Sequence, residues 1–113
     1  MNKIDLNLIS DPLDFNDDGH AILNLAGSYG MVNKDGHVVI PFDYSKLAHS
    51  EDSERPLILA NKNNRFGFLD AAHNVVIPFE YSEATIFEND RAIVCKDDKH
   101  FIINSKNKVI GKL

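Results

Sequence analysis

The chain has 113 residues, of which 43% are hydrophobic and 26% charged, as in a single soluble globular domain. Its apolar runs are about four residues long, which is far below the roughly 20 that a membrane-spanning helix needs. The N-terminus shows no basic start followed by an apolar stretch, so no secretory signal is expected. The single cysteine, Cys95, excludes an internal disulfide and fits a reducing compartment, so we expect a cytoplasmic protein.

The net charge of −5 is distributed unevenly along the sequence. Residues 1–54 carry ten acidic and three basic residues, a net charge of −7, whereas residues 91–113 carry two acidic and six basic residues, a net charge of +4. An acidic half disfavours nucleic acid and suits a protein with a basic surface, although solvated surface charge also keeps proteins soluble. We therefore expect a protein partner, with no nucleic-acid and no membrane partner.

The first expected element lies at the N-terminus. Ile4, Leu6 and Leu8 alternate with polar residues, which is typical of a half-buried strand. Residues 1–14 are therefore expected to form a capping strand that pairs with the C-terminal part of the chain or otherwise closes the end of the sheet.

The remaining sequence consists of repeats. Residues 29–45 and 66–82 align without gaps at an offset of 37, and the block Val-Val-Ile-Pro-Phe-acid-Tyr-Ser recurs with only Asp43 changed to Glu80. A shorter third copy follows at an offset of 34. Such self-similarity is the mark of a repeat architecture.

Each copy contains three short apolar segments separated by turn-forming residues. The segments are four to seven residues long and rich in Val, Ile, Leu and aromatic residues, which is typical of strands. Asp35-Gly36 gives the strongest hairpin signal, because glycine tolerates the positive φ that such turns require. At most a short turn of helix is expected near residues 44–50 or 82–87.

Glycine and proline recur at matching positions inside these segments. Gly30 and Gly67 follow an aromatic residue, where glycine lets a neighbour approach closely, so we expect the aromatic residue of one repeat to cover the glycine of the next. Pro41 and Pro78 lack the N–H that a central strand needs, so we expect them to end their strands or mark a sheet edge.

The predicted fold class is all-β. Short antiparallel strands from three-stranded repeats are expected to form a curled sheet, sandwich-like or partly closed. We expect a single domain over residues 1–113, in which the capping segment precedes repeat 1 (15–47), repeat 2 (48–84) and a truncated repeat 3 (85–113).

This pattern resembles the bacterial WG repeat. That family reads aromatic-x-x-Gly-x-Ala-x-Val, then Trp-Gly-Tyr-Ile-Asp, then Gly-Lys-Val-Val-Ile-Pro-x-x-Tyr. The matching segments are 15–23, 29–32 and 36–44 in the first copy, 66–70 and 75–81 in the second, and Phe87 with 92–94 in the third.

The resemblance covers most of residues 15–110 but lacks the tryptophan that names the family. Tyr29, Phe66 and His100 stand at that position, and the first two preserve its aromatic character. The resemblance implies an interaction module and supplies no catalytic residues.

Few residues suggest chemistry of their own. Cys95 lies inside an expected strand, where a buried and inert thiol is the favoured interpretation. The five histidines show no metal-binding spacing with one another or with the cysteine. Asp17-Asp18-Gly19 lacks the ligand ladder of a calcium loop, so a hairpin turn is expected there. We therefore expect no catalytic residue, no metal site and no cofactor, and the protein is not expected to be an enzyme.

Two sets of residues are candidates for contacts. The paired aromatic residues Phe42/Tyr44 and Phe79/Tyr81 are expected to pack between repeats. The candidate partner-binding residues lie in acidic loops that repeat geometry would place on one side of the molecule. They are Asp14, Asp17, Asp18, Glu51, Asp52 and Glu54.

The leading functional hypothesis is a non-catalytic protein-binding module. Its most specific form is a bacterial immunity protein that binds and neutralises a cognate toxin with a basic surface, since charge complementarity speeds such association. The alternatives are a repeat scaffold or adaptor without a toxin and, less favoured, a small ligand-binding β protein.

Overall fold

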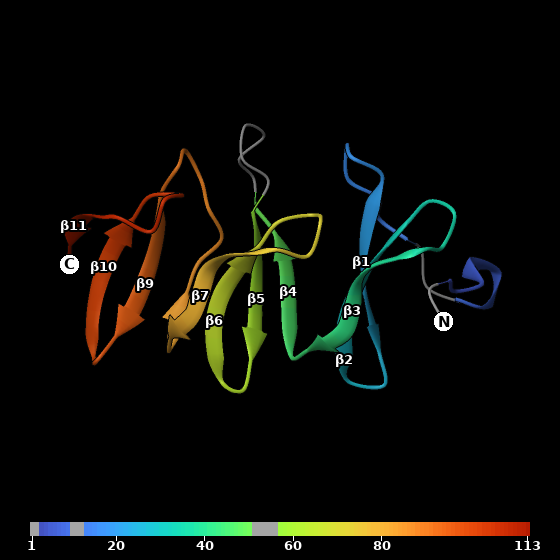
Figure 1. Cartoon of the computed structure of the whole chain (residues 1–113), viewed down its shortest axis with the longest axis horizontal. Helices are drawn as coiled ribbons and strands as arrows, with labels where there is room; N and C mark the ends of the chain where they lie inside the picture. Colours follow the sequence, from blue (N-terminus) through green and yellow to red (C-terminus); the bar gives the residue numbers. More distant parts are fainter. Residues whose placement is uncertain (1–2, 10–12, 51–56) are drawn as a thin grey trace.

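The computed structural model describes residues 3–9, 13–50 and 57–113, which form an elongated stack of small β-sheets (Figure 1). The stack measures 46 × 28 × 22 Å, and the first and last described segments of the chain lie at its opposite ends. A turn of 3-10 helix spans Leu6–Leu8. The strands are β1 (His20–Leu25), β2 (Ser28–Asn33), β3 (Val38–Tyr44), β4 (Lys46–His49), β5 (Ile58–Lys62), β6 (Arg65–Leu69), β7 (Val75–Tyr81), β8 (Glu83–Ala84), β9 (Ala92–Lys96), β10 (Lys99–Ile103) and β11 (Val109–Lys112).

The strands are divided among three antiparallel sheets. Their orders are β1-β2-β3, β4-β5-β6-β7 and β11-β10-β9-β8, so each copy of the repeat supplies one sheet. The predicted all-β, antiparallel class is confirmed, with three successive sheets in place of one curled layer. Among the described residues these sheets do not close into a barrel.

Two kinds of hairpin alternate along the chain. The turns after β1, β5 and β9 contain two residues that both have positive φ, at 26–27, 63–64 and 97–98. The loops after β2, β6 and β10 are longer, at 34–37, 70–74 and 104–108. The first kind lies along one edge of the stack and the second along the opposite edge (Figure 1), so loops of one kind are displayed in register.

The longer loops share one hydrogen-bonding scheme. In the first, the Oδ1 atom of Asn33 accepts the backbone N–H groups of Asp35 and His37, each at 3.0 Å. Asp70 and Asn104 do the same in the second and third loops. The residue three positions after each of these acceptors has positive φ, and these residues are Gly36, His73 and Asn107.

The first two sheets are apolar on both faces because each is packed between two neighbours. Consecutive residues such as Phe68 and Leu69 point to opposite faces, and both are fully buried. One hydrophobic cluster lies between the N-terminal segment and the first sheet, and the next two lie between successive sheets. The largest fully buried side chains are Val32 in the first cluster, Met31, Ile40 and Leu69 in the second, and Phe68, Ile77, Phe87, Val94 and Ile103 in the third.

Tyrosine hydroxyls join successive repeats through these longer loops. The hydroxyl of Tyr44 shares a hydrogen bond of 2.7 Å with Nε2 of His73, and the hydroxyl of Tyr81 donates to Oδ1 of Asn107 at 2.5 Å. Burial, and then the acidic residue beside each, raises the pKa of both tyrosines, so both hydroxyls stay protonated at neutral pH. The positive-φ residue of one repeat is thus bonded to the tyrosine of the repeat before it.

The N-terminal segment is not the capping strand that its alternation predicts. Its residues form a 3-10 turn, because the carboxylate of Asp5 accepts the N–H of Asn7 at 3.0 Å and favours a local turn over an extended chain. One backbone hydrogen bond of 2.7 Å, from Ile4 N–H to the carbonyl of Gly36, ties the segment to the first repeat. It therefore covers the first sheet, at the far end of the stack from the C-terminal copy.

Proline marks the sheet edge without ending the strand. β3 and β7 run through Pro41 and Pro78, and both are edge strands whose register shifts along β2 and β6. An edge strand tolerates the missing N–H because one side of it forms no ladder. The segments that allowed a short helical turn form the strands β4 and β8.

The predicted contact between repeats at the glycines is wrong. A Cβ at Gly30 would lie 2.6 Å from the ring of Phe42, and one at Gly67 would lie 2.7 Å from the carbonyl oxygen of Ile77. Both neighbours belong to the next strand of the same repeat. Because the backbone of β7 crosses so close to β6, glycine is required by packing within a sheet.

Candidate functional site

An acidic loop precedes the first strand of the first sheet. The side chains of Asp14, Asp17 and Asp18 are exposed. Oδ1 of Asn16 accepts the N–H groups of Asp18 and His20, each at 3.0 Å, which fixes the loop as the predicted hairpin turn. The three carboxylates are therefore presented on an ordered backbone.

Among the described residues, the carboxylates of the acidic loop form no ion pair. Across the described ranges the single ion pair joins Lys96 and Glu80 at 3.3 Å, on the second and third sheets. Clustered exposed carboxylates produce a local negative potential that attracts basic groups.

The other three predicted contact residues, Glu51, Asp52 and Glu54, lie outside the described residues. The strand that leads toward them, β4, ends beside the acidic loop, where Nδ2 of Asn16 lies 3.4 Å from Nδ1 of His49. That all six acidic residues share one side of the molecule stays a prediction.

His49 carries an unusual buried nitrogen next to the acidic loop. Its Nε2 atom is buried and makes no hydrogen bond within the described part of the chain. A cavity of about 20 Å³ lies between this imidazole and Asp18 and His20. Burial, and then the nearby His20, lowers the pKa of His49, although Asp14 and Asp18 oppose this shift. The imidazole is therefore held neutral at the base of the loop.

A second hollow separates the N-terminal segment from the first long hairpin loop. It is open and shallow, with a volume of about 710 Å³, and its lining includes Lys3, Asp5, Lys34 and Asp35. Because acidic and basic side chains alternate around it, this hollow favours no particular charge.

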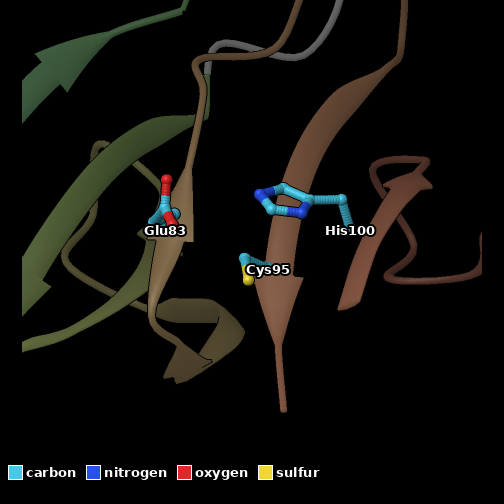
Figure 2. Close-up of side chains that lie close together, drawn as sticks. All are labelled: Glu83, Cys95 and His100. Atoms are coloured by element: carbon cyan, nitrogen blue, oxygen red, sulfur yellow. The ribbon is translucent and has the colours of Figure 1, made fainter. Parts of the chain in front are cut away.

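The structure also gathers three side chains that sequence spacing did not identify. Glu83, Cys95 and His100 each offer a ligand atom, and these atoms lie within 4.8 Å of one another (Figure 2). The sequence feature that could have predicted part of this group is the two-residue turn at 97–98. A hairpin that turns there must pair Cys95 with His100. Glu83 lies next to Cys95 because β8 pairs with β9, and no local sequence pattern predicts β8.

Comparison with known protein families identifies the repeat. A family model described as the WG containing repeat matches residues 29–65 and 66–99, two adjacent copies that cover more than half of the chain. The chain belongs to the WG-repeat family. Each matched WG copy begins at the aromatic residue of an aromatic-glycine pair, Tyr29 or Phe66. No curated protein and no solved structure shows a significant match to the chain.

Membership of the WG-repeat family suggests a protein-binding module built from repeats. In these WG repeats the aromatic residues that recur between copies pack inside and between sheets, as Tyr44 stacks on Phe79 with ring centroids 6.0 Å apart. Over the described ranges, no helix has the length and apolar character needed to cross a membrane.

Proposed function

We propose that this WG-repeat protein is a non-catalytic binding protein, and specifically an immunity protein that neutralises a bacterial toxin through a basic surface on that toxin. The observation that carries the proposal is the acidic loop, where Asp14, Asp17 and Asp18 are exposed, ordered and without an ion pair among the described residues. A preordered acidic surface accelerates association with a basic site at little entropic cost.

The arrangement of the rest of the chain supports binding over catalysis. The core side chains of each sheet are used to hold the next sheet, and the ordered loops project from the edges of the stack (Figure 1). Solenoid repeats of this kind use such extended surfaces for recognition.

The first test is co-expression with the product of the neighbouring gene. An immunity protein is expected to restore growth to cells that make this product and to co-purify with it. Growth arrest that persists, together with the absence of a complex, would rule out the proposal.

The acidic loop is tested with two triple variants of equal charge. Asp14→Asn/Asp17→Asn/Asp18→Asn removes three charges from the loop, whereas Asp35→Asn/Asp43→Asn/Glu88→Gln removes three exposed charges elsewhere. We expect the first variant to lower the association rate about tenfold or more at low salt, and the second to change it far less. Equal losses in both would show that only net charge matters.

A further inference from the structure

The third sheet carries a row of metal-binding residue types across three neighbouring strands. Glu83 on β8 is paired directly with Cys95 on β9, and Cys95 is paired directly with His100 on β10. Residues paired in this way across antiparallel strands project from the same face of a sheet. The three side chains therefore lie close together (Figure 2).

This row is specific to the third repeat. The corresponding row of the second repeat, set by the same pairings, contains Lys46, Asn61 and Phe66. Neither lysine nor phenylalanine binds a metal ion in that setting. In the described ranges, Glu83, Cys95 and His100 form the single group of three such ligands.

The row lies on a face that no further sheet covers in the described part of the chain. In the first two repeats the face of the sheet that carries Met31 or Phe68 is covered by the next sheet. The corresponding face of the third sheet, which carries Ile102, lies at the C-terminal end of the stack (Figure 1). Glu83 and His100 are exposed there, while Cys95 is 4% exposed.

We propose that Glu83, Cys95 and His100 bind Zn²⁺, with a fourth position open to water. A thiolate, an imidazole and a carboxylate are all zinc ligands, and tetrahedral bonds of about 2.0–2.3 Å place such atoms about 3.3–3.7 Å apart. The present spread of up to 4.8 Å closes by roughly 1 Å when the two exposed side chains turn toward the fixed sulfur. Binding deprotonates the thiol and releases that proton to solvent.

The ion would bind the shortest strand, β8, to the last sheet of the stack. β8 contains only Glu83 and Ala84, and it joins the sheet through β9. A metal bond from Glu83 to ligands on β9 and β10 would hold all three strands together. This proposal does not depend on the proposed immunity function.

The test uses the full-length chain without a histidine tag, reduced and titrated with Co²⁺. We expect a thiolate-to-cobalt charge-transfer band, visible bands of tetrahedral cobalt, and their loss on addition of Zn²⁺. Zn²⁺ is also expected to raise the melting temperature of the native chain. Cys95→Ala and His100→Ala should remove the band and the thermal shift, and Glu83→Gln should weaken binding about tenfold or more.

His37→Ala and Glu88→Gln are the matched controls, since both replace exposed residues outside the row. They should bind cobalt as the native chain does. Circular dichroism of each apo variant separates loss of a ligand from loss of fold, and Glu83→Gln, at an exposed position, provides a variant that keeps the core. A native chain without the charge-transfer band, or ligand variants that bind like the controls, would overturn the proposal.

Discussion

Three equivalent loop residues show how one backbone conformation serves different contacts. Gly36, His73 and Asn107 all have positive φ, yet the last two bind a tyrosine of the preceding repeat whereas Gly36 faces the N-terminal segment. A Cβ on Gly36 would lie within van der Waals overlap of the carbonyl oxygen of Ile4. Glycine is therefore required there by a contact as well as by its φ.

Replacing this glycine should detach the N-terminal segment. Gly36→Ala is expected to abolish the protection of the Ile4 N–H from hydrogen exchange, because the added methyl displaces the Ile4 carbonyl. Gly27→Ala is the matched control, since Gly27 has a similar φ of 90° and no atom within 4 Å of a Cβ. Gly27→Ala should lower the free energy of unfolding by about 1–2 kcal/mol through backbone strain, and the Ile4 N–H should stay protected from hydrogen exchange. Unchanged exchange in Gly36→Ala would contradict the contact.

His49 makes stability depend on pH. Burial lowers its pKa, so the folded chain binds fewer protons than the unfolded chain as the pH falls through the ordinary value of about 6.5. The free energy of unfolding should therefore decrease on acidification from about pH 7.5 to about 5.5. This loss of stability begins near the pKa of His49 in the unfolded chain and is complete below its pKa in the folded chain.

Two variants isolate the contribution of His49. His49→Asn can still accept the hydrogen bond of Asn16 and does not titrate, so its unfolding midpoint should fall less on acidification than that of the native chain. His37→Asn removes an exposed histidine and should retain the native pH dependence. Parallel pH profiles for the native chain and His49→Asn would count against this assignment.

Among the elements, the close crossing of β6 and β7 is the most restrictive. A methyl group at Gly67 would meet the backbone of Ile77, Pro78 and Phe79, which cannot move without shifting the whole strand. At Gly30 the three nearest atoms to such a methyl group belong to the ring of Phe42, a side chain that can turn without moving the backbone.

The two alanine variants should therefore differ in cost. Gly67→Ala is expected to lower the free energy of unfolding by about 1–3 kcal/mol, as overpacked cores do, and by more than Gly30→Ala. Urea denaturation of both variants measures this difference. A larger loss in Gly30→Ala would contradict the assigned roles of backbone and side chain.

Strands and turns were predictable from sequence because local rules govern them. The apolar segments, the Asp35-Gly36 turn and the edge prolines all follow from residue chemistry that acts over a few positions. The N-terminal alternation was misleading, because one local hydrogen bond, donated by the Asn7 N–H to the Asp5 carboxylate, favoured a turn. Pairing of β8 with β9 is long-range, so sequence alone did not bring Glu83 to Cys95.

At the scale of the whole molecule, stability depends on how well the sheets are joined. Each sheet buries apolar side chains against its neighbours, and each such side chain contributes about 1.5–3 kcal/mol when fully buried. The hydrogen bonds of the Tyr44 and Tyr81 hydroxyls make this packing specific. Each bond joins a tyrosine to a loop residue of the next repeat and so fixes the position of one repeat relative to the next.

Double-mutant cycles across both repeat junctions test this account most directly. The pairs are Tyr44→Phe with His73→Gly, and Tyr81→Phe with Asn107→Gly, where glycine is the residue that the first repeat carries at the same loop position. Each pair should show a coupling energy of about 0.5–1.5 kcal/mol by urea denaturation. The crossed pair, Tyr44→Phe with Asn107→Gly, should be additive within about 0.5 kcal/mol. Additivity within the two bonded pairs would contradict the account.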